Sequence, residues 1–373
     1  MLKQLLHGLF GSGGIKRDVQ RASAPSRDSA FDADIASRLS RGLHARIGDN
    51  EDLERWAGLT PEAKAALEQR LAAECLGMLF EHGAVFAAAD RLFEDAASRE
   101  LFRSLLCFRI LGPGRIAIPI DAATHWARRG AAAALRTGDS PHAGTFGGVS
   151  RFDLQFEGEH LSVDAWAGNI AWTFLLRQYW FERGAVKIMP MPGDCIIDAG
   201  ACFGDTALAF ASGAGGPGSV HAFEIDPANL AVAQDNLAQN PRAGGRVRLN
   251  PLALGSEAGT LYRYGSGPGA QVRADPGGEP VEVTTLDAYA DARQLGRVDF
   301  IKMDIEGAEM DALLGAKETL IRHRPRLAIS LYHRAADLAR IPVWINRLDL
   351  GYRFWLEHYT IHHEETVLFA AAD

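Results

Sequence analysis

The sequence predicts an α/β protein in which a mostly parallel sheet is covered by helices on both faces. Two observations carry this prediction. From residue 193 onward, short apolar runs typical of buried strands alternate with segments of helical periodicity. Hydrophobic residues make up 47% of the 373 residues and charged residues 23%, which is the composition of a globular protein with a full core. Alternation of strand and helix is typical of a doubly wound parallel sheet.

The elements of this second half follow one another in a regular order. We expect the first strand at Cys195–Ala199, a short apolar run after the turn signal Pro192-Gly193. The later strands are expected at Val220–Phe223, Arg246–Leu249, Val298–Met303, Leu327–Tyr332, Tyr352–Leu356 and Thr366–Ala370. The helices are expected at Thr206–Ala211, Asn229–Leu237, Glu306–Arg322 and Ala335–Asp349. Two short strands, Leu261–Tyr264 and Val281–Thr284, interrupt the alternation around a loop rich in Gly and Pro.

The first half divides into a polar segment, a helical region and the start of the α/β domain. Residues 1–30 are expected to be disordered, because most of them are small, polar or turn-forming. Residues 31–150 are expected to be helical, since Thr60-Pro61-Glu62 marks a helix start and apolar residues follow it at helical spacing. Near residue 151 apolar residues begin to alternate with polar ones, which predicts a β-hairpin. This hairpin is expected to begin a domain that spans 151–373. An aromatic helix is expected next, at Ala171–Phe181.

Charge and cysteine usage narrow the function. A formal net charge of −8 argues against a protein that coats nucleic acid, so no nucleic-acid partner is expected. The four cysteines form no CxxC pair and do not suggest a disulfide framework, which favours a reducing, cytoplasmic compartment. No apolar run reaches the roughly eighteen residues that a membrane span needs, so we expect no transmembrane segment.

The loop after the first strand predicts a nucleotide pocket. It reads Asp198-Ala-Gly200-Ala201-Cys-Phe-Gly204-Asp205-Thr206, and its glycines allow a sharp turn with close approach to a ligand. The next strand ends in Phe223-Glu224, where a carboxylate can accept both hydroxyls of a ribose. A nicotinamide site would instead need GxGxxG, and Asp205 puts a negative charge where the pyrophosphate would lie. S-adenosylmethionine carries a sulfonium and an ammonium but no phosphate, so it suits an acidic loop.

The expected donor site combines this loop with the end of the next strand. A simpler interpretation is that the glycines only shape a turn between strand and helix. We favour the pocket because the loop and Glu224 occur together, about twenty residues apart, as such a site requires. The residues assigned to the donor site are Asp198, Gly200, Ala201, Gly204, Asp205, Thr206, Glu224 and Ile225.

Several stretches of the second half resemble the FkbM family of methyltransferases. They are 193–210 (GDCIIDAGACFGDTALAF), 222–236 (AFEIDPANLAVAQDN), 301–309 (IKMDIEGAE) and 329–342 (ISLYHRAADLARIP), extended by 352–358 and 366–370. The resemblance implies a Rossmann-like class I methyltransferase fold and S-adenosylmethionine as the methyl donor. It also implies O-methylation, usually of a hydroxyl on a sugar, glycan or secondary metabolite. Glu357 stands where many relatives have Arg, a departure that concerns the acceptor contacts and not the donor site.

Ionisable residues gather where the Val298–Met303 strand and the strand after it end. Methyl transfer to oxygen needs an aligned acceptor hydroxyl and a group that takes its proton. The predicted catalytic residues are Asp304, His333 and Lys302. Asp304 can orient or deprotonate a hydroxyl, and a histidine of near-neutral pKa is a suitable base. The residues expected to bind the acceptor are Glu306, Tyr332 and His358.

These residues have alternative interpretations. Glu306 and Glu309 can be first-turn acids that stabilise a helix N-terminus, and this interpretation is favoured for Glu309. His333 can be a capping or core histidine. Asp304 and Glu306 can hold a divalent ion through oxygen. Three histidines near the C-terminus support zinc only weakly, and no metal is predicted; they are His358, His362 and His363.

Three classes of function remain open. The first is an S-adenosylmethionine-dependent O-methyltransferase with a small-molecule or glycan acceptor. The second is a nicotinamide-dependent oxidoreductase, whose glycine motif is missing here, and the third is a non-catalytic scaffold with a methyltransferase fold. The helical region can recognise the acceptor, bind a partner or form a homodimer, and the sequence does not choose among these roles.

Overall fold

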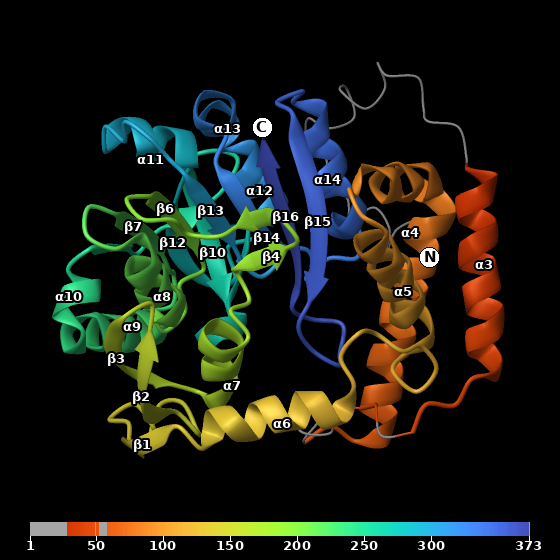
Figure 1. Ribbon diagram of the computed structural model, residues 1–373, viewed down its shortest axis with the longest axis horizontal. Coiled ribbons are helices and arrows are strands. Elements are labelled where there is room, and N and C mark those ends of the chain that lie inside the picture. The colour runs from red at the N-terminus through yellow and green to blue at the C-terminus, as the bar shows by residue number, and fades with distance from the viewer. Residues whose placement is uncertain (1–27, 49, 52–57, 373) are drawn as a thin grey trace.

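The computed structural model describes residues 28–48, 50–51 and 58–372, and it has the predicted α/β architecture (Figure 1). A central sheet occupies the middle of the molecule, and the N-terminal helices stand at one side of it. The segment predicted to be disordered, 1–30, lies almost wholly outside the described residues. Its last two residues belong to helix α3 (Ser29–His44), because the side chain of Asp28 caps that helix by accepting from two backbone N–H groups.

The central sheet has seven strands. In spatial order they are β15 (Tyr352–His358), β16 (Thr366–Ala372), β14 (Arg326–Ser330), β13 (Phe300–Met303), β6 (Cys195–Ala199), β7 (Ser219–Phe223) and β8 (Val247–Asn250). Neighbouring strands are parallel except that β16 runs antiparallel to both β14 and β15. The chain starts at β6, fills one side with β7 and β8, and then crosses to β13. Ligands of such sheets bind at the carboxyl ends of the strands where the order reverses, here between β6 and β13.

Helices cover both faces of the sheet. They are α8 (Asp205–Ala214), α9 (Pro227–Gln239), α10 (Pro241–Gly244), α11 (Leu286–Ala292), α12 (Glu309–Leu314), α13 (Lys317–His323) and α14 (Asp337–Arg347). Alternate strand residues enter two different apolar clusters. Ile197 packs into one cluster with Leu313 of α12 and Leu338 of α14. Ile196 packs into the other with Phe210 of α8, so the period of two along the strand separates the two cores.

The helix predicted at Glu306–Arg322 is interrupted. Two short helices, α12 and α13, replace it, and the break lies at Gly315. A Cβ atom on Gly315 would lie 2.0 Å from the carbonyl oxygen of Gly255, so the two backbones touch there. Close packing against this neighbouring segment, which sequence periodicity does not report, therefore divides the helix.

The segment that interrupts the alternation forms a small sheet of its own. Its spatial order is β11 (Gln271–Arg273), β10 (Gly259–Tyr264), β12 (Glu279–Thr284) and β9 (Ala253–Leu254). The two predicted strands correspond to β10 and β12. A short 3₁₀ turn, η2 (Gly267–Gly269), joins β10 to β11.

The described residues before Arg136 are mainly helical. The helices are α3, α4 (Pro61–Leu92), α5 (Ala96–Leu111) and α6 (Ala122–Ala133), and Thr60 caps α4 as its sequence predicts. Strand β1 (Arg136–Asp139) lies inside the region expected to be helical, and it pairs with the hairpin β2 (Ser150–Phe156) and β3 (Glu159–Ala165). α6 runs along one side of the molecule between the first helices and this small sheet (Figure 1).

The N-terminal helices share a core with the central sheet. Phe102 of α5 lies in the same apolar cluster as Phe354 and Leu356 of β15. The backbone N–H of Glu94 also donates to the carbonyl of Phe354 at 2.9 Å. Helices α4 and α5 are therefore packed onto the edge of the sheet rather than forming a separate core.

The aromatic helix predicted at Ala171–Phe181 is shorter than expected. It is built from α7 (Ala167–Asn169) and a π-helical turn, η1 (Ile170–Leu175). Arg177 has a φ of +53°, a left-handed conformation that stops the helix. The chain then enters the hairpin β4 (Phe181–Arg183) and β5 (Val186–Ile188).

Helix α4 qualifies the expectation that no transmembrane segment is present. By length and composition alone, Pro61–Leu92 is long and apolar enough to cross a membrane, with 22% of its most apolar window buried. A single such helix is weak evidence for a membrane span, since core helices of soluble proteins meet the same criterion.

The shared core predicts different costs for two phenylalanines. We expect Phe102→Ala to lower the free energy of unfolding by about 3–5 kcal/mol, because the ring is fully buried against Phe86 and Phe93. The control Phe80→Ala, on a side chain that is 79% exposed, should change it by about 0.5 kcal/mol or less. Urea unfolding of both variants makes the comparison. Equal effects would show that α5 is not part of the core.

Candidate functional site

The turn that follows β6 is shaped by two glycines with left-handed backbone. Gly200 has a φ of +83°, and a Cβ atom there would lie 1.8 Å from the carbonyl oxygen of Asp304. Gly204 has a φ of +75° and begins α8. The N–H groups of Gly200 and Ala201 donate to the carbonyl of Phe223 at 3.0 and 2.9 Å. The turn is therefore held closely between the ends of β7 and β13.

A buried ion pair joins β6 to β13 beneath this turn. Lys302 Nζ lies 3.1 Å from Asp198 Oδ1, and it donates to the carbonyls of Ala199 and Gly200 at 3.1 and 2.6 Å. Burial alone would lower the pKa of Lys302, but Asp198 and Asp304 outweigh it and raise the pKa. Lys302 thus supports the turn from within the core, where it is 1% exposed, and this position does not suit its predicted catalytic role.

Two predicted donor-site residues also point into the protein. Thr206 Oγ1 donates to Asp198 at 2.7 Å, and Asp205 accepts from Thr173 at 2.8 Å. Burial raises the pKa of Asp205. Both side chains fix the start of α8, and neither is among the residues that line the cavity at the switch point.

Glu224 lies at the end of β7 and lines that cavity. One carboxylate oxygen accepts from the N–H of Cys202 at 2.9 Å, and the other accepts from Ile225 and Asp226 at 2.6 and 2.7 Å. Burial raises the pKa of Glu224, although these three donors oppose the shift. Because the backbone fixes the carboxylate, its remaining lone pairs keep one direction.

The cavity in front of Glu224 has a volume of about 60 Å³. Of the predicted donor-site residues, Gly200, Glu224 and Ile225 line it, together with Asp304 and Glu306. The loop around η2 forms one of its walls. A wider hollow of about 480 Å³ lies along α9 and α10, but no ionisable side chain lines it. We therefore take the cavity at the switch point as the candidate site.

Asp304 follows β13 directly and receives two tyrosine hydroxyls. Tyr179 donates to its Oδ2 and Tyr332 to its Oδ1, both at 2.9 Å. Burial favours the neutral acid, but His333, Lys302 and the two hydroxyls outweigh it and lower the pKa of Asp304. A carboxylate with both oxygens engaged is a weak base and a good anchor.

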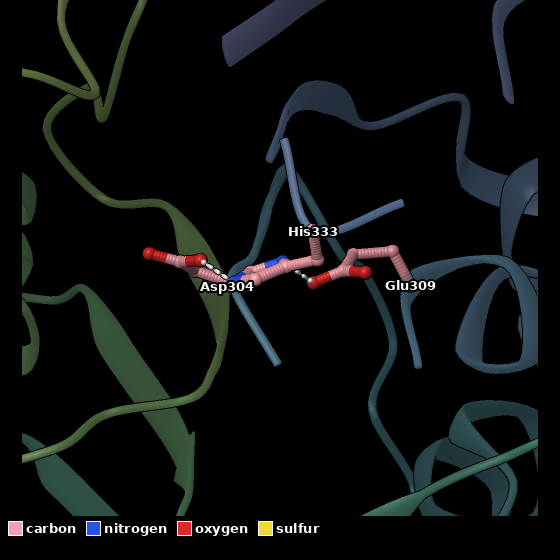
Figure 2. A group of neighbouring side chains, drawn as sticks. All are labelled: Asp304, Glu309 and His333. Atoms are coloured by element: carbon pink, nitrogen blue, oxygen red, sulfur yellow. Dashed lines mark ion pairs between the residues drawn. The ribbon is translucent and has the colours of Figure 1, made fainter. Parts of the chain in front are cut away.

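The ring of His333 lies between Asp304 and Glu309, as Figure 2 shows. Nδ1 is 2.9 Å from Glu309 Oε1, and Nε2 is 3.5 Å from both Asp304 Oδ1 and Glu306 Oε1. Burial alone would lower the pKa of His333, but the three carboxylates raise it well above its usual range. Glu309 is fully buried and accepts from the N–H of Ile305 at 2.8 Å. Beyond being a first-turn acid of α12, Glu309 is thus a direct partner of His333.

The same residues raise the question of a metal ion, which was not predicted. Asp304, Glu309 and His333 each offer one ligand atom, and these atoms lie within 4.8 Å of one another. The two ring nitrogens, however, face different carboxylates (Figure 2). Such an arrangement is that of a histidine ion-paired on both sides. Within the part of the chain that the structure describes, the C-terminal histidines form no comparable group.

One predicted acceptor residue lies within the core. His358 is hydrogen-bonded to Thr366 at 2.8 Å and to Thr360 at 3.5 Å, and burial lowers its pKa to about 3. It is therefore a neutral histidine that closes the β15–β16 hairpin. Its neighbour Glu357, the departure from the FkbM pattern, pairs with Arg183 of β4 at 2.8 Å, so this acid has a structural partner.

Two residues of the site were missed in the sequence. Tyr179 lies between η1 and β4, and its bond to Asp304 spans 125 positions of the chain. Arg109 of α5 donates to the carbonyls of Tyr332 and His363 at 2.7 and 3.3 Å, and the first bond spans 223 positions. No motif marks either residue, because only the folded chain brings these segments together.

The chain is similar to known methyltransferases. Residues 198–354 match the family model described as the methyltransferase FkbM domain. The 2-O-methyltransferase NoeI of Sinorhizobium fredii (strain NBRC 101917 / NGR234) is 27% identical over 164 residues, which cover 38% of this chain and 65% of NoeI. The crystal structure of methyltransferase FkbM from Methylobacillus flagellatus KT superposes with a TM-score of 0.52 at 20% identity, covering 79% of this chain and 60% of that one. The chain thus spans less than two thirds of either relative.

Sheet order, glycine turn and strand-end acid define the Rossmann-like fold of the class I S-adenosylmethionine-dependent methyltransferases. Residues 198–354 are similar to the methyltransferase FkbM domain within this class. The resemblance inferred from the IKMDIEGAE stretch and its neighbours is confirmed.

The contacts of His333 predict how its protonation responds to substitution. We expect Glu309→Gln to lower the pKa of His333, because it removes the nearest of three negative charges that favour the imidazolium. NMR titration of the His333 ring proton measures this directly. The control Glu318→Gln changes an exposed first-turn acid of α13 and should leave the titration unchanged. Equal pKa values in the wild type and Glu309→Gln would refute the pairing.

Proposed function

We propose that this chain is an S-adenosylmethionine-dependent O-methyltransferase that acts on a hydroxyl of a sugar, glycan or secondary metabolite. The observation that carries the proposal is the His333 ring, held by buried Glu309 beside Asp304, which lines the same cavity as Glu224. The FkbM domain and the likeness to a 2-O-methyltransferase support it.

The residues at the cavity fit the methyl donor. Gly200 leaves space where a side chain would meet the backbone of Asp304, and Glu224 offers a fixed carboxylate to ribose hydroxyls. The ionisable side chains lining the described cavity are all acidic, which suits a cationic ligand and disfavours a phosphate. Ligand sites usually have volumes of about 300 Å³ or more. We infer that the loop around η2 moves outward when the donor enters.

Proton removal falls to His333 in this proposal. When bound, the donor would supply an electrophilic methyl group on its sulfonium sulfur. The chain must align an acceptor hydroxyl and accept its proton as the oxygen attacks. His333 Nε2 takes that proton, and Glu309 at Nδ1 stabilises the resulting imidazolium. Asp304, held by two tyrosines, stays ionised and orients the acceptor.

A nicotinamide-dependent oxidoreductase and a non-catalytic scaffold are the competing functions. Calorimetric titration with S-adenosylmethionine, S-adenosylhomocysteine and NAD separates them. We expect both sulfur ligands to bind and NAD not to bind, because the cavity wall is acidic. Binding of NAD alone would favour the oxidoreductase, and binding of none of the three would favour the scaffold.

Glu224 provides the test of the donor site. We expect Glu224→Ala to weaken binding of S-adenosylhomocysteine by about 2 kcal/mol, or roughly thirtyfold in Kd, because it removes charge-assisted hydrogen bonds to the ribose. The control Glu257→Ala removes an exposed acid elsewhere in the domain and should not alter Kd. Wild-type affinity in Glu224→Ala would exclude this residue as the ribose ligand.

His333 provides the test of the mechanism. We expect His333→Ala to lower kcat by about a hundredfold or more, as loss of a general base does. Because a base must be deprotonated and the pKa of His333 is raised, wild-type kcat should rise with pH above the usual range of histidine. That rise should move to lower pH in Glu309→Gln. Unchanged turnover in His333→Ala would remove this residue as the base.

Removal of metal ions with a chelator tests whether Asp304, Glu309 and His333 transfer a proton or bind a metal ion. With His333 ion-paired on both sides, we expect EDTA to leave kcat unchanged. Loss of activity with EDTA and its recovery with Mg²⁺ would instead assign Asp304 and Glu309 as metal ligands.

A further inference from the structure

A second cavity lies between α4, the C-terminal end of α5 and the loop from β15 to β16. Its volume is about 200 Å³. Apolar side chains form much of its wall, among them Leu71, Ala72, Phe108 and Ile361. The side chain of Arg109 also lines it. An apolar wall with a buried cation distinguishes this cavity from the acidic one at the donor site.

Arg109 carries a buried charge that no carboxylate contacts within the described residues, and Glu74 and Asp337 act on it only from beyond ion-pair distance. Its side chain is 8% exposed, and no carboxylate among the described residues lies within ion-pair distance of it. Nη2 donates to the carbonyls of Tyr332 and His363, but neutral carbonyls do not balance a guanidinium. Burial lowers the pKa of Arg109, which reflects the cost of keeping the charge there. Buried charges in proteins are normally paired, and the adjoining cavity has room for an anion.

The other charged side chains near this cavity have partners of their own. Glu68 lines the wall, and its carboxylate lies 3.9 Å from Lys64 Nζ. Glu364 lies 3.6 Å from the ring of His363, which also lines the wall. Neither acid is paired with Arg109, so the guanidinium remains the strongest attraction for a ligand in this cavity.

We propose that this cavity binds a small organic anion, either a carboxylate or a phosphate monoester. Arg109 holds the charged group, and Leu71, Phe108 and Ile361 pack against the apolar part. Arg109 suits this role because its planar fork binds carboxylate and phosphate in two-point contacts.

The position of Tyr332 connects the cavity to the reaction. Its carbonyl accepts from Arg109 and its hydroxyl donates to Asp304, so one tyrosine separates the two sites. This step rests on the proposed function: the anion is then part of the acceptor, next to the hydroxyl that is methylated. The acceptor class becomes a hydroxylated compound that carries an acidic group.

Three ligands with the same apolar part test the proposal. Calorimetric titration of the full chain with hexanoate, hexyl phosphate and 1-hexanol compares two charged heads with a neutral one. We expect either anion to bind at least about tenfold more tightly than the alcohol, because only the anions pair with Arg109. The tighter anion identifies the head group. Equal binding of 1-hexanol, or no binding of either anion, would overturn the proposal.

Variants locate the binding. We expect Arg109→Gln to weaken hexanoate binding about tenfold and Arg109→Lys to retain part of it. Because Arg109 also holds two carbonyls, Ala72→Trp supplies a test that leaves the guanidinium in place and fills the cavity. Its matched control is Ala73→Trp, at the neighbouring exposed position. Hexanoate should bind Ala73→Trp and not Ala72→Trp, and equal binding to both would refute the assignment.

Binding of S-adenosylhomocysteine, the product that the methyl donor leaves, tests the proposed methyltransferase separately from the proposed anion cavity. S-adenosylhomocysteine should bind Ala72→Trp as it binds the wild type, since the two cavities have no lining residue in common. Binding of hexanoate without S-adenosylhomocysteine would uphold the anion cavity and overturn the methyltransferase. The converse would uphold the methyltransferase and overturn the anion cavity.

Discussion

The site depends on the ion pair between Asp198 of β6 and Lys302 of β13. It crosses the point where strand order reverses, and the ammonium also holds the carbonyls of Ala199 and Gly200. Both groups are out of water, so removing either one would leave the other as an unpaired buried charge, at a cost of about 3–5 kcal/mol. The pair therefore fixes how β6 and β13 end relative to each other. The left-handed turn at Gly200 passes against Asp304 between these ends, where glycine leaves the space that a Cβ atom would fill.

The group of side chains around His333 extends outward from that fixed edge. Asp304 follows Lys302 by two residues, and its orientation is completed by hydroxyls from Tyr179 and Tyr332. His333 then lies between this carboxylate and Glu309. Three carboxylates therefore surround the imidazole, with Glu309 at Nδ1 and with Asp304 and Glu306 at Nε2. Such an arrangement favours a proton on His333, which is the end state of a proton transfer from an acceptor hydroxyl.

The sequence predicted the parts of this arrangement that are local. The strands β6, β7, β13 and β14 were predicted from apolar runs, and Glu224 and Asp304 from their places at strand ends. The roles of Lys302 and Asp205 could not be predicted in this way, because the direction of a side chain at a strand end depends on which partner lies across the sheet. Glu309 was interpreted as a helix acid, since its spacing suits that role and its contact with His333 exists only when α12 and the β14 end meet. Contacts between segments far apart in the chain therefore cannot be predicted from sequence periodicity.

The N-terminal helices matter to the site for the same reason. They pack on β15 as part of the core, and this packing brings Arg109 against the carbonyl of Tyr332. Tyr179 reaches Asp304 from the segment between η1 and β4. An FkbM domain bounded at residues 198–354 would contain neither side chain. The carboxylate of Asp304 is therefore oriented partly by residues outside the matched domain. The turn at Gly200 and the ring of His333 lie within residues 198–354, so the surroundings of Asp304 are fixed from inside that range and from outside it.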